Sequence, residues 1–202
     1  MSGSKVDQML FRDWRRKQFP TPPRVSDAAF LRRVTLDLAG RLPSVEEIRV
    51  FLDDKSPDKR NRKIDELLDS DDFADLQAMY WCDDFRVKSE FPINLWPNAV
   101  QAYHGYLRDA VRRNRPWNEV AFELLTASGS NFRNPPANFF RAVADRSPRA
   151  LAQAAALSLM NLRMEKMSES EQAEFSNFFS RIRARKSFCG FTHSLALVFI
   201  LH

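Results

Sequence analysis

The stretch FLRRVTLDLAGRLPSVEEIRVFLDDKSPDKRNRKIDELLDS, residues 30–70, carries apolar residues at helical spacing between clear helix boundaries. Ser44 and Glu47 have the S-x-x-E spacing of a capping box, in which each side chain satisfies a free amide of the first helical turn. Ser56 and Pro57 place a proline at the first position of another helix, where its missing N–H costs nothing. The stretch therefore predicts short helices that bury apolar stripes in a shared core.

The same boundary signals recur along the rest of the chain. Ser26 precedes the first of these helices, and further start signals follow at Ser147-Pro148 and at Ser168 with Glu171. Helical spacing also predicts helices over 72–87, 98–114, 117–127 and from 168 to about 184. With no convincing alternating strand pattern before the tail, the expected fold class is all-α, an irregular bundle of about eight to ten short helices. The loop at 90–97 is the candidate boundary between two lobes.

The composition is that of a globular protein with a packed core. Seventeen Phe and four Trp against five Gly point to large side chains packed on regular elements. The net charge of +5 makes the protein basic, but both signs interleave along the chain, which is typical of a solvated surface. The start of the chain lacks the pattern of a signal peptide, and the apolar tail is shorter than the ~20 residues of a membrane span.

The 30–70 stretch resembles the planctomycete cytochrome-associated domain of unknown function, found in large exported proteins beside cytochrome c-like and other domains. The resemblance continues through DDFADLQAMYWCDDFRVK (71–88), YHGYLRDAVRRNRPWNEVAFELLTASGSNFRNPPANFFRA (103–142) and SPRALAQAAALSLMNLR (147–163). It implies a single helical domain, here 5–187, and a periplasmic or cell-envelope location for the full-length protein.

One departure from that family concerns cofactors. Many members carry a Cys-x-x-Cys-His stretch that could hold haem, whereas this chain has MEKMSE at 164–169, without cysteine or histidine. Cys82 and Cys189 are far apart in sequence, so they form no local zinc or redox motif, and whether they pair stays open. We therefore expect no haem, zinc or other cofactor.

The loop TASGSNFRNPPANFFRA, residues 126–142, allows two interpretations. In the favoured one it is a connector, with Gly129 at positive φ, Asn138 capping NFFRA, and three aromatic residues in the core: Phe132, Phe139 and Phe140. In the other it presents a rigid polar rim that binds a carboxylate, sulfate or sugar through bidentate hydrogen bonds. The candidate rim residues are Asn131, Arg133, Asn138 and Arg141.

His104 is the only histidine before the tail and is the candidate general acid or base. A packing role is favoured for it, and no catalytic constellation is evident. The chain is thus expected to be a non-catalytic module of an envelope-associated multidomain system linked to cytochromes or polysaccharide use, with anionic glycan or other domains as partners. The first alternative is a hydrolase or lyase acting on anionic polysaccharide, with His104 in its active site.

The second alternative is a nucleic-acid-binding module. Two basic runs could meet phosphates. Their members are Arg112, Arg113 and Arg115, and then Arg181, Arg183, Arg185 and Lys186. Because neither a reading helix nor stacking aromatics can be identified beside them, a solvated face is the favoured interpretation.

The end of the chain, FCGFTHSLALVFILH at 188–202, differs in character from the rest. The resemblance is expected to stop near Lys186, and 195–201 has high β propensity without charge or proline, a hazard on a surface. Two explanations are open. The favoured one is an out-of-frame readout of a truncated gene, which would make the chain a fragment of a longer protein. The other is a real strand that packs against the helices or a partner.

Overall fold

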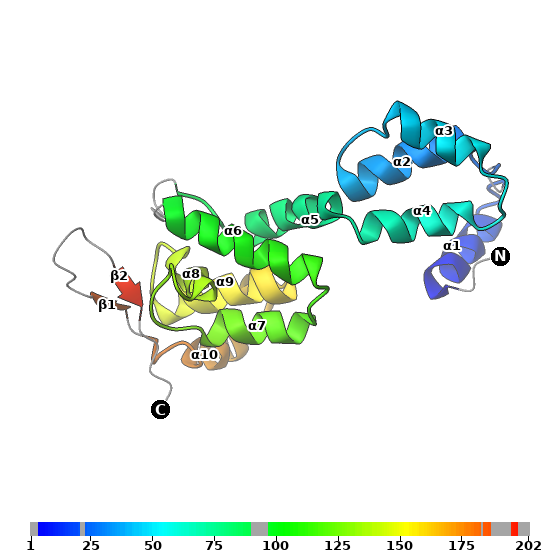
Figure 1. Ribbon diagram of the computed structural model, residues 1–202. Coiled ribbons are helices and arrows are strands. Elements are labelled where there is room, and N and C mark those ends of the chain that lie inside the picture. Colours follow the sequence, from blue (N-terminus) through cyan, green and yellow to red (C-terminus); the bar gives the residue numbers. More distant parts are fainter. Residues whose placement is uncertain (1–3, 21–22, 90–96, 183, 187–194, 198–202) are drawn as a thin grey trace.

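The computed structural model describes residues 4–20, 23–89, 97–182, 184–186 and 195–197, and it confirms the all-α fold class (Figure 1). The elements of the described residues are α1 (Lys5–Arg16), α2 (Asp27–Ala39), α3 (Val45–Asp53), α4 (Lys59–Leu68), α5 (Asp71–Asp84), α6 (Pro97–Arg112), α7 (Trp117–Thr126), α8 (Asn138–Arg141), α9 (Pro148–Met160) and α10 (Glu169–Asn177), with the 3₁₀ helices η1 (Pro135–Ala137) and η2 (Met164–Lys166) and the strands β1 (Ala184–Lys186) and β2 (Leu195–Leu197). None of the described helices is long and apolar enough to span a membrane.

The predicted boundaries of α2 and α3 are confirmed by their caps. The Ser26 hydroxyl accepts from the Ala29 amide, and Ser44 with Glu47 forms the complete capping box. Gly40 ends α2 in the left-handed conformation with φ of 68°, and a Cβ there would lie 3.0 Å from a methyl group of Leu76. Both the backbone and the space at this position therefore favour glycine.

The predicted start of the next helix at Ser56-Pro57 is wrong, because α4 begins at Lys59. The Asp54 side chain accepts from the Ser56 amide at 2.8 Å, which holds these residues in an Asx turn. The helix starts only after that turn, and Asp58 at its N-cap makes no side-chain capping bond.

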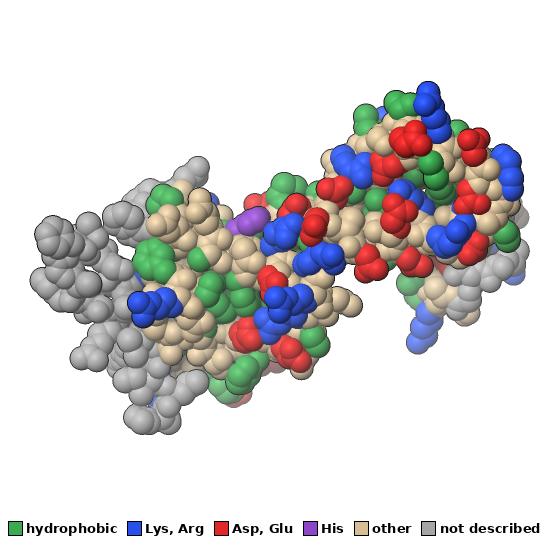
Figure 2. Space-filling view, viewed as in Figure 1, with side chains coloured by type: hydrophobic (Ala, Val, Ile, Leu, Met, Phe, Trp, Pro, Cys, Tyr) green, Lys and Arg blue, Asp and Glu red, His purple; other side chains and the backbone are tan. Residues whose placement is uncertain are grey.

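An ion-pair cluster joins the front helices, α2–α4, to the start of α5. Arg41 binds both oxygens of Glu47, at 2.8 and 3.1 Å, and reaches Asp72 at 2.6 Å. Lys63 is buried beneath them and contacts Glu47 at 3.4 Å and Glu66 at 2.8 Å. Elsewhere on the front helices both signs of charge are interspersed, as Figure 2 shows.

Helix α5 links the two ends of the molecule, since it packs against α2 and α4 on one side and α6 on the other (Figure 1). Small residues let the helices approach closely, with Ala74 and Ala78 fully buried. Helices α6–α10 enclose the larger, back core. Its largest buried members include Phe85, Tyr103, Leu107, Leu124, Phe139, Phe140 and Leu151.

The 126–142 loop is mainly a packed connector, with two differences from expectation. Gly129 has φ of 92°, and Phe139 and Phe140 are buried, as predicted. Phe132, however, is 40% exposed rather than in the core. Asn138 does not cap α8; its amide nitrogen instead donates to the backbone carbonyls of Asn131 and Pro135, both at 2.9 Å, and so closes the loop on itself.

The last helix is shorter than predicted. Helix α10 ends at Asn177, and β1 follows where the helix was expected to finish. Strand β1 pairs antiparallel with β2, which belongs to the apolar tail, in the register Arg185↔Ala196. The rest of the tail and residues 90–96 of the candidate lobe boundary at 90–97 lie outside the described residues.

Candidate functional site

The back helices carry an apolar groove with a cavity of about 460 Å³. Its walls come from three segments that the fold brings together: α7, α9, and α10 with the residues just after it. The lining consists of Trp117, Ala121, Leu125, Ala155, Leu159, Met160, Phe175, Phe178, Phe179, Arg181 and Ile182. Arg181 is the only charged residue among the described residues that line it.

The walls of the groove are packed against aromatic rings where they meet the core, and they are exposed at the rim. Trp117 stacks on the buried Phe85 at 5.9 Å between ring centroids, and Phe175 contacts Phe179 edge-on at 5.5 Å. In contrast, Phe178 is 80% exposed and Met160 is 60% exposed. Large apolar side chains grouped in this way, beside a concave apolar surface, are typical of a site that binds another molecule.

A second concavity, the polar cleft, has a volume of about 580 Å³ and lies between α6, α7 and the 126–142 loop. The loop contributes backbone and side chains of Ser128, Asn134, Pro135 and Pro136 to its wall. Across from them, the Glu123 carboxylate accepts from Arg115 at 2.6 and 3.0 Å and from the Tyr106 hydroxyl at 2.8 Å.

The Arg115 guanidinium lowers the pKa of Glu123, and the Tyr106 hydroxyl lowers it further, so Glu123 is ionised at neutral pH. Burial, followed by the hydrogen bond to Glu123, raises the pKa of Tyr106 above its ordinary value. The three side chains thus form a fixed, charge-compensated wall, able to hold hydroxyl groups but not to supply a base of ordinary strength.

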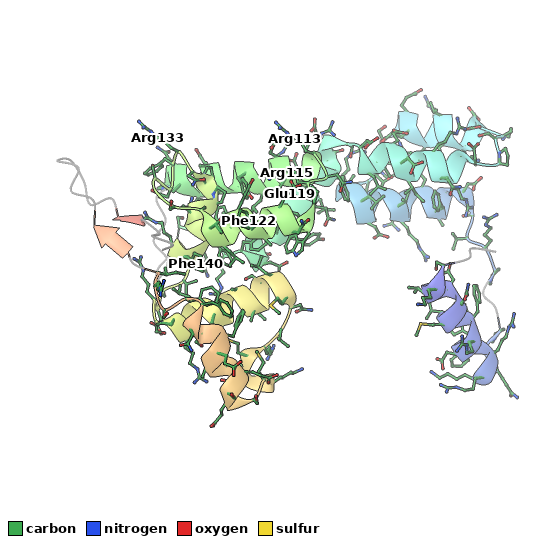
Figure 3. All side chains as sticks on the ribbon, turned by 90° about the horizontal axis from the view of Figure 1, so that it is seen from below. Arg113, Arg115, Glu119, Phe122, Arg133 and Phe140 are labelled. Atoms are coloured by element: carbon green, nitrogen blue, oxygen red, sulfur yellow. The ribbon has the colours of Figure 1, made fainter. Side chains whose placement is uncertain are left out.

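The four predicted rim residues do not share one surface. Asn131 and Asn138 are buried, and one amide atom of each, Asn131 Nδ2 and Asn138 Oδ1, has no hydrogen-bond partner. Arg141 is only 8% exposed, and burial lowers its pKa. Arg133 is exposed, and Figure 3 shows it at the opposite end of the back helices from Arg115 and Glu119.

His104 lies exposed on α6. Within the described part of the chain, no carboxylate is hydrogen-bonded to it, and it lines neither the groove nor the cleft. Asp75 lies near enough for the charge of His104 to lower the pKa of that carboxyl slightly, but the larger cause is the hydrogen bond that Arg108 donates to Asp75. Among the described residues, Asp75 is therefore held by Arg108 and not by His104.

Comparison with models of protein families assigns the chain to one family. The family model described as PSCyt2, protein of unknown function (DUF1549), matches residues 5–194. The chain belongs to the PSCyt2 family. This agrees with the planctomycete cytochrome-associated domain that the sequence resembles, and the match runs past Lys186, where the resemblance was expected to stop. No curated protein and no solved structure matched the chain.

In this PSCyt2 chain, the segment where many relatives were expected to carry Cys-x-x-Cys-His folds as η2. Met164 is buried in the back core, which is a packing role. Across the described ranges, no group of three or more His, Cys, Asp or Glu side chains is placed to hold a metal ion. Cys82 is half-buried, and burial raises its pKa to about 11, while Cys189 lies outside the described residues.

Sequence reasoning missed both concavities. Phe175, Phe178 and Phe179 have the spacing of a core stripe, so nothing in the pattern separates the exposed Phe178 from its buried neighbours. The polar cleft depends on residues 106, 115, 123 and 134, which only the folded chain brings together. The proline pair at 135–136 was the one sequence signal for it, because it marks a stiff wall in an otherwise helical region.

Proposed function

We propose that this PSCyt2 chain is a non-catalytic module that binds another domain of an envelope-associated multidomain system through the apolar groove. The occupant is an amphipathic segment whose apolar face fills the groove and whose flank carries carboxylates. The observation that carries the proposal is the exposure of Phe178 and Met160 around a preformed apolar cavity. The family resemblance adds that neighbouring domains include cytochrome c-like ones.

Charge complementarity predicts the sign of the charged residues that flank the apolar face of the occupant. The groove has no acidic lining residue among those described, and Arg181 stands at its edge. In sequence, Arg183, Arg185 and Lys186 follow directly. In sequence, residues 181–186 carry four cations and no carboxylate, which favours an acidic flank over a basic one.

Two synthetic helical peptides with the same leucine face, one flanked by glutamates and one by lysines, test the proposal. We expect the glutamate peptide to bind at least roughly tenfold more tightly in a fluorescence anisotropy titration, because the charge difference acts at the groove edge. Phe178→Ser should weaken its binding by roughly tenfold or more, since burial of a phenylalanine side chain is worth ~1.5–3 kcal/mol.

Phe122→Ser is the matched control, because Phe122 is also a highly exposed phenylalanine of the back helices but does not line the groove. It should leave binding unchanged. Equal losses in the two variants, or no binding of either peptide, would contradict the proposal. A dimer in sedimentation velocity that Phe178→Ser abolishes would instead identify a second copy as the occupant.

The polar cleft supports a second candidate function, the binding of an anionic glycan without catalysis. It combines a half-buried tyrosine, a fixed Arg–Glu pair and the hydroxyl and amide groups of Ser128 and Asn134, which suit sugar hydroxyls. Arg133, next to Asn134 in the chain, is exposed but does not line the cleft, so it would meet a glycan that extends along the loop past Asn134. By contrast, Arg112, Arg113 and Arg115 are ion-paired with Asp71, Asp109 and Glu123, which disfavours the nucleic-acid alternative.

Arg133→Ala should reduce binding to a sulfated or uronic-acid oligosaccharide array by at least roughly fivefold, because one charge-assisted hydrogen bond is worth about 1–3 kcal/mol. The melting temperature should stay nearly unchanged, since the side chain is exposed. Arg113→Ala is the control, because that exposed arginine is already paired with Asp109. A large loss of stability without a change in binding would assign Arg133 to the fold alone.

A further inference from the structure

We infer that α1 is an interfacial helix that lies on an anionic lipid surface. This inference concerns a different part of the chain from the groove and does not depend on it. None of the residues of α1 is buried. In Figure 3, α1 stands apart from the other helices, below the front helices.

The helix has an apolar face, which Asp7 interrupts between Trp14 and Phe11. Val6, Leu10 and Trp14 follow one another at a spacing of four, and Phe11 lies beside them, with its ring edge-on to Trp14 at 5.6 Å. Val6 is 66% exposed and Leu10 is 48% exposed. A solvated apolar stripe on a short helix is costly unless another phase or molecule covers it.

The opposite face is basic. Lys5, Arg12 and Arg16 lie there at helical spacing, and all three are exposed. From Lys5 to Lys17 the chain has five cations and two carboxylates, so +3 of its total net charge of +5 sits on this helix and its C-cap residue. Asp13 is itself paired with Arg16 and Lys17 at 2.6 and 2.7 Å, which leaves the acidic side chain compensated.

The combination of a basic face and an apolar face favours a lipid surface, rather than a groove on another protein, as the binding partner of α1. Interfacial helices combine a strongly basic polar face with a Trp- and Leu-bearing apolar face and bind anionic membranes through both. Trp14 adds an amphipathic ring to the apolar face, and tryptophan favours the headgroup region. The helix is ~18 Å long, so it lies in the plane of the surface rather than crossing it.

Co-sedimentation of the full chain with vesicles tests the inference. We expect binding to phosphatidylcholine vesicles that contain phosphatidylglycerol, and at least roughly tenfold weaker binding to vesicles of phosphatidylcholine alone. Leu10→Glu should reduce binding to the anionic vesicles by roughly tenfold or more, because it puts a charge into the apolar face. Circular dichroism should show an unchanged fold, since Leu10 is not part of a core.

Leu42→Glu is the matched control, because Leu42 is an exposed leucine outside α1, and it makes the same change in net charge. Its binding should differ little from that of the unaltered chain. Absence of binding to the anionic vesicles, equal binding to both kinds of vesicle, or equal losses in the two variants would overturn the inference. Self-association that requires Leu10 would also overturn it, by assigning the apolar face to a second copy.

Discussion

Replacing Phe140 with alanine is expected to lower the free energy of unfolding by about 3–5 kcal/mol. Phe140 is almost fully buried where α8 meets the back core, and its ring packs edge-on against Phe139 at 5.0 Å and Phe179 at 5.9 Å. Alanine would leave a cavity that these rings cannot fill without losing their own contacts. Urea denaturation followed by circular dichroism measures the loss.

Phe132→Ala provides the comparison within the same loop. Phe132 is substantially exposed, so its truncation should cost no more than about 1 kcal/mol. Similar losses in the two variants would mean that the loop does not anchor the back core through Phe140. Phe140→Ala should also weaken peptide binding to the groove, because Phe179 contacts Phe140 and lines the groove.

Replacing Glu47 with glutamine is expected to cost about 2–3 kcal/mol. The change removes the charge that meets Arg41 at 2.8 and 3.1 Å and leaves the buried Lys63 with only Glu66. It also weakens the capping bond that the Ser44 amide donates to Glu47 at 2.7 Å. Solvent screens this ion pair in part and limits the loss, because Arg41 is partly exposed.

The same side chain gives the front helices a pH dependence. The Arg41 guanidinium holds the pKa of Glu47 well below its ordinary value, so the folded state binds a proton less readily than the unfolded state. The contribution of Glu47 is therefore complete above about pH 5 and is lost as the pH falls below ~4. The difference in the free energy of unfolding between the unaltered chain and Glu47→Gln should become smaller over that pH range.

Glu46→Gln is the control for this prediction. Glu46 lies in the same first turn of α3 but is exposed, and its loss should change stability by no more than about 0.5 kcal/mol. If the difference in the free energy of unfolding between the unaltered chain and Glu47→Gln stayed constant from neutral pH to pH 3, the assigned role of the Arg41–Glu47 pair would be contradicted.

Local signals predicted the fold where the chain itself supplies the hydrogen-bond partner. Ser44 with Glu47 and Ser168 with Glu171 form the two predicted capping boxes, because each needs only residues three positions apart. The start of α4 was mispredicted because Asp54, outside the Ser-Pro signal, captures the Ser56 amide. The end of α10 was mispredicted because the chain tightens there into turns with hydrogen bonds three residues apart, from the Phe179 amide to Ser176 and from the Ser180 amide to Asn177.

The candidate sites were harder to predict, because exposure is a property of the assembled helices. A helical stripe that contains Phe175, Phe178 and Phe179 has the same pattern whether its outer member meets solvent or another helix. The asparagines of the 126–142 loop show the opposite case, in which residues typical of a surface are buried. Asn131 and Asn138 are typical of a polar rim in sequence, yet the fold buries both of them.

Nuclear magnetic resonance of the methyl-labelled chain, titrated with the glutamate-flanked peptide, tests the groove most directly. The account predicts saturable shifts of the Ala121, Leu125 and Ala155 methyl groups, which come from two of the helices that line the groove. Shifts confined to Ala127 in the polar cleft, or to Val6 and Leu10 on α1, with the groove methyl groups unmoved at saturation, would contradict it.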